Sequence, residues 1–164
     1  MNVQHATLCY PVADDRMLLI EKKRGVGEGL YNGPGGKVEP GETPREAVVR
    51  EVREETQLRV HDPQKAGELE FFFGEEPFMF VHVFRATEFS GEPEESPEAR
   101  PEWFGVDEVP YDEMWPDDRY WLPELFDGET FAGTLYFDAD GEDLLDWTLD
   151  FGVAVGSGQR HPDG

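Results

Sequence analysis

The stretch GKVEPGETPREAVVREVREETQL, residues 36–58, joins a glycine-rich loop to a segment that is crowded with glutamates. Thr43, Pro44 and Glu46 predict the start of a helix. Thr43 takes the N-cap position and Pro44 the first helical position, while Glu46 completes a capping box in which two side chains bond to free backbone N–H groups. The stretch therefore predicts a loop that leads into a helix with a well-defined first turn.

Three glutamates project from one side of this predicted helix. At about 100° per residue, Glu51 and Glu55 differ by about 40°, and Glu54 lies about 100° from Glu55. A solvated face with pairs at i and i+4 is the ordinary explanation of such a helix, and it suits Glu46 with Arg50. It suits the other three poorly, because neighbouring like charges repel each other unless a cation lies between them. We therefore interpret these glutamates as a metal site.

The spacing of the stretch resembles the Nudix box, G-x5-E-x7-R-E-U-x-E-E-x-G-U, where U is aliphatic. Gly36, Glu42 and the run 50–55 occupy the family's positions, and Leu58 closes the pattern. Gln57 stands where the family has its last glycine, which usually ends the helix in a conformation that glycine adopts freely, so the helix end can differ. The resemblance implies the family's fold, an α/β/α sandwich with a mixed central sheet.

The resemblance also implies a metal-dependent hydrolase. The family's ion is Mg²⁺, with Mn²⁺ as an alternative, and carboxylate oxygens suit Mg²⁺, which keeps several waters and shares phosphate oxygens. Arg50 would orient the acidic cluster, and Glu42 would support the loop or ligate through water. Either Glu54 or Glu55 would act on the attacking water. The implied metal ligands are Glu51, Glu54, Glu55 and the backbone carbonyl of Gly36, and the implied catalytic residues are Glu54, Glu55, Glu51 and Arg50.

Short apolar runs on both sides of the box predict the strands of the sheet. His82 lies within one of them and is expected to be a packed, hydrogen-bonded side chain. Residues 1–151 are expected to form one Nudix domain, and residues 152–164 a disordered tail, because their Gly-Ser-Gly composition buries little. The predicted strands cover residues 6–12 and 16–22 as a hairpin, 65–74 and 77–89 as two long strands around a turn at 74–76, 101–109 as a short strand, and 130–137 and 143–149 as a closing hairpin.

A narrower resemblance covers residues 6–149. It is to the oxidized purine nucleoside triphosphatases, or 8-oxo-dGTP diphosphatases, of animals. It implies hydrolysis of a purine nucleoside triphosphate to the monophosphate and pyrophosphate, in nucleotide-pool sanitation. The matching motifs are Lys22-Lys23-Arg24-Gly25, Tyr31-Asn32-Gly33, Gly35-Gly36-Lys37-Val38, Val81-His82-Val83-Phe84, Arg100-Pro101, Met114-Trp115-Pro116-Asp117-Asp118 and Tyr120-Trp121.

The same resemblance implies a pocket for the base. Asn32 would contact the base from the loop, Trp115 would stack on it, and Asp117 with Asp118 would read the purine edge. Two adjacent carboxyls raise one another's pKa, so one of them can carry a proton and donate while the other accepts. An ordinary helix start with an N-cap aspartate is the alternative, and Pro123 then falls in the first turn of that helix, where proline is tolerated.

Further residues are expected near the substrate. The cluster 22–24 is either a solvated strand end or a phosphate-steering group, from which we take Lys23, and Lys37 would place a positive charge beside a polyphosphate. Val26 and Ala99 stand where the family has larger residues, so the pocket can be wider. The remaining residues expected to contact substrate or line the pocket are Thr7, Glu42, Phe71, Met79, Glu98 and Trp121.

The composition restricts the partners and the compartment. The net charge is −23, from 37 acidic and 14 basic residues, and such a surface repels nucleic acid. Molar salt screens this repulsion, so a halophilic cytoplasm fits, with an acidic protein of an ordinary cytosol as the alternative. Cys9 is the single cysteine, and no apolar run approaches the ~20 residues of a membrane helix. We expect a cytoplasmic protein, without membrane partners, that is a monomer rather than a dimer.

Two other functions remain compatible with the box. One is a Nudix enzyme for a different diphosphate, such as ADP-ribose or a dinucleotide, because the box reads the diphosphate and the metal but not the leaving group. The other is a non-catalytic nucleotide-binding module. The segment 115–118 favours a purine substrate, and the retained carboxylates favour catalysis.

Overall fold

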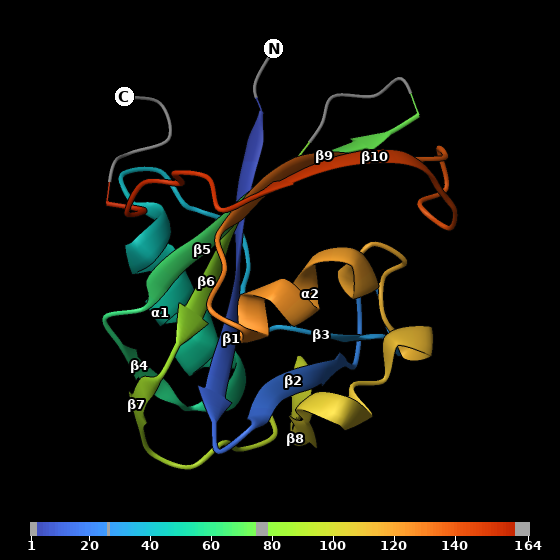
Figure 1. The fold of residues 1–164 in the computed structure, drawn as a ribbon. Coiled ribbons are helices and arrows are strands. Elements are labelled where there is room, and N and C mark those ends of the chain that lie inside the picture. The colour runs from blue at the N-terminus through green and yellow to red at the C-terminus, as the bar shows by residue number, and fades with distance from the viewer. Residues whose placement is uncertain (1–2, 26, 75–78, 160–164) are drawn as a thin grey trace.

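A computed structural model describes residues 3–25, 27–74 and 79–159 of the chain. A central sheet carries helix α1 (Pro44–Thr56) on one face and helix α2 (Asp118–Phe126) on the other (Figure 1). The sheet contains both parallel and antiparallel neighbours. The predicted α/β/α sandwich with a mixed central sheet is therefore confirmed.

The strands are β1 (Gln4–Ala13), β2 (Arg16–Lys22), β3 (Tyr31–Asn32), β4 (Arg59–His61), β5 (Gln64–Phe73), β6 (Met79–Ala86), β7 (Glu88–Ser90), β8 (Ala99–Gly105), β9 (Phe131–Phe137) and β10 (Leu144–Phe151). Within the described residues, the main sheet has the order β10-β9-β5-β6-β1-β2-β3, and β8 pairs with β2. β1 is parallel to β6, and β5 is parallel to β9. A separate two-stranded sheet joins β4 to β7.

Both predicted hairpins are present. β1 and β2 pair antiparallel beside their turn, where Val12 lies opposite Met17. β9 and β10 pair over their whole length, from Phe131 opposite Phe151 to Phe137 opposite Leu144. These pairings come from residues that are close in sequence, which is why short apolar runs around a turn were sufficient to predict them.

The predicted strand over residues 77–89 is wrong at its far end. β6 stops at Ala86, and β7 is a separate strand that pairs with β4 instead of continuing the main sheet. Residues 75–78, which hold most of the predicted turn, lie outside the described residues. The predicted strand 101–109 begins earlier, at Ala99, and gives way to a short 3₁₀ helix, η1 (Val106–Glu108). His82 is buried, and its Nε2 lies 3.0 Å from Nδ1 of His5, so the expected packed role is confirmed.

Alternation along the strands divides the apolar side chains between the two faces of the sheet. Cys9 packs with Val48 and Val52 under α1, whereas its neighbour Tyr10 packs with Trp121 under α2. Removing this apolar surface from water contributes about 25 cal/mol per Å² and attaches each helix to its face of the sheet. The strands consequently hold α1 and α2 in fixed positions on opposite sides.

Helix α1 begins as predicted and ends in the family's manner in spite of Gln57. The N–H of Glu46 donates to Oγ1 of Thr43, and the N–H of Thr43 donates to Oε1 of Glu46, which completes the capping box. Gln57 has φ +67°, in the left-handed region, and its N–H donates to the carbonyl of Arg53. The helix thus ends in the left-handed conformation that glycine favours, but with a residue that carries a Cβ atom.

Helix α2 contains Pro123 well inside its second turn, at the sixth helical position, and not in its first turn as expected. A proline there lacks the N–H that would bond to the carbonyl four residues earlier. Trp121, Leu122 and Leu125 are nonetheless fully buried. Packing against the sheet, rather than a complete hydrogen-bond ladder, stabilises this short helix.

The segment 152–159 differs from the predicted disorder. Val155 is buried, and the carbonyl of Gly158 accepts a hydrogen bond from the free N–H of Arg45 in the first turn of α1. The hydroxyl of Thr130 donates to the carbonyl of Val153. Residues 160–164 of the predicted tail lie outside the described residues. None of the described helices is long and apolar enough to cross a bilayer.

Candidate active site

The glycine-rich loop runs directly beside β1. The N–H of Thr7 donates to the carbonyl of Gly36 at 2.8 Å, and the N–H of Cys9 donates to the carbonyl of Pro34 at 2.8 Å. A Cβ atom on Gly35 would lie 2.0 Å from the carbonyl oxygen of Thr7, so only glycine fits there. The loop therefore takes the place of a strand at this edge of β1 and holds the Gly36 carbonyl in a fixed position.

Arg50 is the centre of a hydrogen-bond network on α1. Its Nη1 donates to Glu51 at 2.6 Å and to Glu54 at 3.3 Å, while its Nε and Nη2 donate to the two oxygens of Glu42 at 2.7 and 2.9 Å. Nη2 also donates to the carbonyl of Lys37 at 3.1 Å. One guanidinium thus connects the helix to the loop, and Glu42 accepts a further bond from the N–H of Glu39.

Glu55 faces the loop from the next turn of α1. Its side chain is buried, and Oε1 accepts a hydrogen bond from the N–H of Gly35 at 2.8 Å. Burial raises its pKa to about 7, and the nearby charge of Glu51 adds to this rise, whereas the bond from Gly35 opposes it. Glu51 lies against the loop as well, because a Cβ atom on Gly36 would be 2.5 Å from its carboxylate.

The donor chemistry of this cluster fits Mg²⁺. Carboxylate oxygens and a backbone carbonyl are the hard ligands that this ion prefers. Burial raises the pKa of both Glu51 and Glu55, and a nearby divalent cation would favour their ionised forms instead. Among the described residues, no three Asp, Glu, His or Cys side chains are arranged so that they could hold an ion as they stand. Arg50 pairs with both Glu51 and Glu54.

A cavity of about 410 Å³ opens beside this cluster, on the face of the sheet that carries α2. Glu55, Gly35 and Gly36 form one wall, and Asn32, Trp115 and the Asp117–Asp118 pair line another part. The rings of Phe71 and Phe73, which are both on β5, stack at 6.4 Å and line an apolar part. One cavity therefore brings the box into contact with the segment 115–118, which is more than 50 residues away in sequence.

The two aspartates at the start of α2 are almost completely buried, with 1% and 2% of their surfaces exposed. Oδ2 of Asp117 accepts a hydrogen bond from the indole N–H of Trp121 at 2.8 Å. Oδ1 of Asp117 and Oδ2 of Asp118 have no partner among the described residues. Asp117 does take the N-cap position of α2, as the alternative expected, but its side chain accepts from Trp121 and makes no cap hydrogen bond.

Burial determines the protonation of this pair. It raises the pKa of Asp117 to about 6, although the bond from Trp121 lowers it. It raises the pKa of Asp118 well above the usual value, and the charge of Asp117 raises it further. Desolvation is thus the main cause for both carboxyls, and the like charge contributes only to Asp118, whereas the sequence pointed to the like charges alone.

The structure places most of the predicted residues around this cavity. Trp121 is buried beneath it and contacts Asp117 rather than the cavity. Ala99 is buried in β8 outside the lining, so its small size does not widen the cavity, and Val26 lies outside the described residues. The predicted residues that line the cavity are Thr7, Asn32, Gly36, Glu55, Phe71, Met79, Trp115, Asp117 and Asp118.

Three charged residues that were expected near the substrate do not line the cavity. Lys23 pairs with Glu95, and Glu98 pairs with Arg24 at the surface. Lys37 is exposed and contributes its backbone carbonyl to Arg50. Among the described lysines it is Lys22 that lines the cavity. Because side chains alternate along a strand, Ile20 and Lys22 of β2 share the cavity face, and this alternation could have distinguished Lys22 from Lys23.

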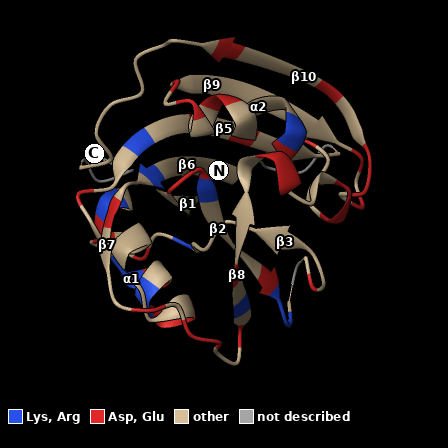
Figure 2. Ribbon diagram, turned by 60° about the horizontal axis from the view of Figure 1, so that its bottom comes forward, with Lys and Arg blue, Asp and Glu red and all other residues tan. Residues whose placement is uncertain are grey.

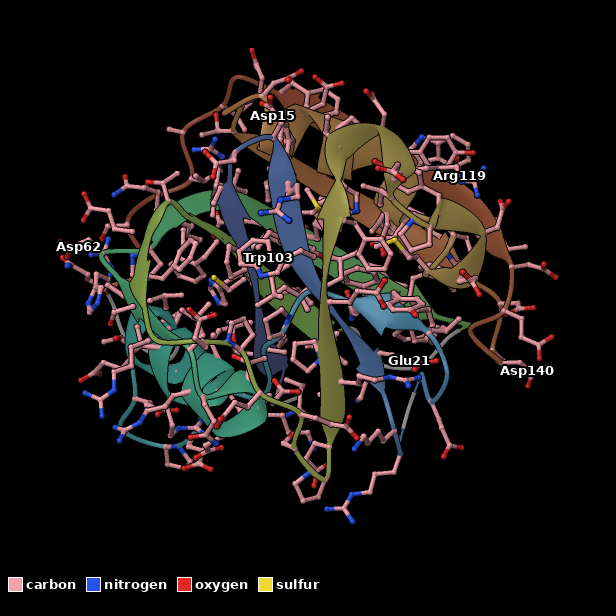
Figure 3. All side chains as sticks on the ribbon, turned by 90° about the horizontal axis from the view of Figure 1, so that it is seen from below. Asp15, Glu21, Asp62, Trp103, Arg119 and Asp140 are labelled. Atoms are coloured by element: carbon pink, nitrogen blue, oxygen red, sulfur yellow. The ribbon has the colours of Figure 1, made fainter. Side chains whose placement is uncertain are left out.

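The sequence predicted the turn between β9 and β10 but not that it would line the cavity. Ala139, Asp140 and Gly141 line the cavity opposite the loop (Figure 3 labels Asp140). A Cβ atom on Gly141 would contact Phe73 and Trp115. No motif marks this turn as part of a site, and its position beside the cavity depends on the parallel pairing of β9 with β5, which links residues more than 60 positions apart. The same view shows Glu21 and Trp103 on the β2–β8 part of the sheet, away from this turn.

Comparison with known proteins agrees with this geometry. The model of the NUDIX domain matches residues 3–125, which include the loop, the box helix and most of α2. The chain belongs to the Nudix family. This Nudix chain is 46% identical over 140 residues to the oxidized purine nucleoside triphosphate hydrolase of Danio rerio, across 85% of the chain and 88% of that protein.

Two further proteins are similar over most of their length. The oxidized purine nucleoside triphosphate hydrolase of Mus musculus is 42% identical over 144 residues, across 87% of this chain and 92% of that protein. The crystal structure of a mutator MutT protein from Bacillus halodurans superposes with a TM-score of 0.82 at 33% identity, across 90% of this chain and 98% of that one. The similarity therefore extends beyond the box to the whole fold.

Proposed function

We propose that this Nudix protein hydrolyses oxidized purine nucleoside triphosphates, such as 8-oxo-dGTP, to the monophosphate and pyrophosphate. The observation that carries the proposal is the single cavity that holds both Glu55 of the box and the buried Asp117–Asp118 pair. Similarity to the zebrafish and mouse hydrolases over most of the chain supports the same substrate class. The proposed role is nucleotide-pool sanitation.

The box would hold the metal and the phosphates. Glu51, Glu54, Glu55 and the Gly36 carbonyl are the proposed ligands of Mg²⁺, or of Mn²⁺ in its place. When bound, the ion supplies countercharge to the phosphates and lowers the pKa of an attacking water. Arg50 keeps Glu51 and Glu54 on the side of α1 that faces the loop. Lys22 adds a positive charge at the cavity wall, in a protein that is otherwise strongly acidic.

The proton acceptor in the reaction is one of two glutamates. Glu54 is exposed, and Arg50 at 3.3 Å is its only ion-pair partner among the described residues, so its carboxylate can turn toward a water. Glu55 is held by the N–H of Gly35 and faces the cavity directly. Both remain candidates, and substitution of each distinguishes them.

The Asp pair and Trp115 would recognise the base. A carboxyl that keeps its proton offers one donor, and its ionised neighbour offers acceptors, so the pair can meet both kinds of group on the edge of a purine. Trp115 lines the cavity with its ring perpendicular to Phe137, at 6.1 Å between centroids, and supplies an apolar surface for a base. Buried polar groups that stay unpaired with the wrong base penalise that base strongly.

A substrate panel tests the proposed function. With Mg²⁺ present, 8-oxo-dGTP should be hydrolysed with a higher kcat/KM than dGTP, and pyrophosphate should be a product. Equal rates on dGTP would remove the proposed preference. Faster cleavage of ADP-ribose or a dinucleotide would assign the cavity to another Nudix reaction, and binding without product would indicate a non-catalytic module.

The acidic surface sets the conditions for this assay. Acidic residues lie on both helices and on β10 (Figure 2), and the chain carries a net charge of −23. Raising the salt from about 0.1 M to about 1 M shortens the Debye length from about 10 Å to about 3 Å. We therefore expect the thermal unfolding midpoint to rise across this range of KCl. A midpoint that stays constant or falls would contradict the halophilic interpretation.

A further inference from the structure

Tyr10 connects the two halves of the base pocket without entering it. It lies on β1, one residue beyond Cys9, with its side chain on the face of the sheet that carries α2, and it is fully buried. Its ring packs edge-on against Trp121, with 5.8 Å between centroids, and Trp121 in turn bonds to Asp117. On its other side, the hydroxyl donates to Oδ1 of Asn32 at 3.3 Å.

The amide of Asn32 therefore has a defined orientation. Oδ1 accepts from the hydroxyl of Tyr10 and from the backbone N–H of Gly33 at 3.0 Å. A flipped amide would direct its NH₂ group at the Gly33 N–H, which can only donate, so the flipped form is disfavoured. Because Asn32 lines the cavity, the group that it can offer to a bound base is the NH₂ donor.

The hydroxyl of Tyr10 stays protonated under all relevant conditions. Burial raises the pKa of the phenol, and the charges of Asp118 and Asp117 raise it further. The phenol therefore remains available as a donor to Asn32. The ring also occupies the space beside Gly33, where an added Cβ atom would lie 2.8 Å from Tyr10 Cε1, so the loop and the phenol fit closely.

We propose that Tyr10 is a positioning residue for purine selectivity: the Gly33 N–H sets which atom of the Asn32 amide faces the loop, and the Tyr10 hydroxyl, as a second bond to Oδ1, holds the amide in place so that the cavity presents its NH₂ donor. This inference rests on the proposed function. An amide held by the Gly33 N–H alone can still move about its side-chain bonds, so it places its NH₂ donor less accurately, whereas an amide held at two points accepts only an edge with an acceptor at that point. Tyr10 thus acts on the base through Asn32 and has no part in the phosphate chemistry.

The variant Tyr10→Phe removes the hydroxyl and keeps the buried ring. We expect KM for 8-oxo-dGTP to rise about threefold to tenfold, which is the effect of losing one neutral hydrogen bond, while kcat changes less than about twofold. The preference for 8-oxo-dGTP over dGTP should fall by a similar factor. Affinity for the product 8-oxo-dGMP, measured by titration calorimetry, should weaken in parallel, because product binding involves the base pocket and requires no turnover.

A double-mutant cycle separates positioning from a general structural effect. In an Asn32→Ala background, Tyr10→Phe should produce no further change in KM, since its target is absent. Tyr31→Phe is the matched control, because Tyr31 adjoins Asn32 in sequence and packs against Phe104 instead. An unchanged KM in Tyr10→Phe, a full effect in both backgrounds, or a fall in kcat alone would overturn the inference. Failure of the wild-type protein to hydrolyse 8-oxo-dGTP would instead overturn the proposed function.

Discussion

The cavity contains two groups of carboxylates that manage their charge in opposite ways. On α1, Arg50 donates to Glu51 and Glu54, and the N–H of Gly35 donates to Glu55. At the start of α2, Asp117 and Asp118 are both buried. The indole N–H of Trp121 donates to Asp117, and neither aspartate pairs with a basic side chain among the described residues. The first group is arranged for negative charge and for a metal, whereas the second favours a proton. In the proposed function, the same chemical group would serve the phosphates at one end of the cavity and the base at the other.

This difference follows from where each group lies. The α1 glutamates range from exposed (Glu54) to buried (Glu55), and they lie next to a loop that brings a backbone donor and a carbonyl. The aspartates are buried beside Tyr10 and Trp121, and neither forms an ion pair with a basic side chain among the described residues. Desolvation penalises the charged form, and a carboxyl without a counterion responds by keeping its proton.

The largest expected effect is on the metal-binding side. Glu54→Gln should lower kcat for 8-oxo-dGTP at least about 100-fold, because the amide can neither accept a proton nor balance a divalent ion. The thermal unfolding midpoint should stay close to that of the wild type, because the side chain is exposed. Glu124→Gln on α2, outside the cavity, is the control and should retain full turnover. Unchanged turnover in Glu54→Gln would remove Glu54 from the mechanism.

The second-largest effect is expected from Arg50, and it tests whether this residue orients the glutamates of α1. Arg50→Lys keeps the positive charge but loses the planar guanidinium that reaches Glu42, Glu51 and Glu54 at once. The Mg²⁺ concentration for half-maximal activity should rise about tenfold to 100-fold, as for other residues that orient metal ligands. A metal titration of activity measures this shift. An unchanged Mg²⁺ requirement with normal turnover would show that the network is dispensable.

Much of the difference between the two groups of carboxylates could be predicted from the sequence, but not all of it. The box is a contiguous run with fixed spacing, so α1, its capping box and its acidic side follow from local rules. The burial of Asp117 and Asp118 follows only from packing between α2 and a sheet whose strands come from distant segments. The roles of Tyr10 and of the turn at 139–141 were missed for this reason, since each is placed beside the site by sheet pairing rather than by a motif.

A smaller effect is expected from substitution in the Asp117–Asp118 pair. Here the variant should be more stable than the wild type. The pKa of each aspartate is raised in the folded protein, so the folded state loses stability as the pH rises from about 4, the usual Asp pKa, through about 6 and above. Asp118→Asn removes the part of this loss of stability that comes from Asp118. The variant should be more stable than the wild type by about 1–3 kcal/mol at pH 8, and the difference should vanish near pH 4.

The same variant should lose selectivity. An asparagine beside an ionised Asp117 cannot release a proton, so its donor and acceptor pattern is fixed, and kcat/KM for 8-oxo-dGTP should fall about tenfold or more. Urea unfolding at several pH values measures the stability change, and the substrate panel measures the selectivity. The titratable neighbours of the pair, Tyr10 and Tyr111, stay protonated over this range because their own pKa values are raised. Equal stability of variant and wild type at pH 8 would contradict the protonated interpretation.

The smallest effect concerns Gln57, just beyond the glutamates that are the proposed metal ligands. Its φ of +67° places a Cβ-bearing residue in the left-handed region, which costs about 1 kcal/mol relative to glycine. Gln57→Gly should therefore raise the free energy of unfolding by about 0.5–1 kcal/mol. Gln57→Ala keeps the Cβ atom and should give no such gain. Turnover should not change, because the N–H of residue 57 still donates to Arg53 and Glu55 keeps its place against Gly35. A lower kcat in Gln57→Gly would mean that the side chain at the helix end, and not only its backbone, helps to hold the glutamates.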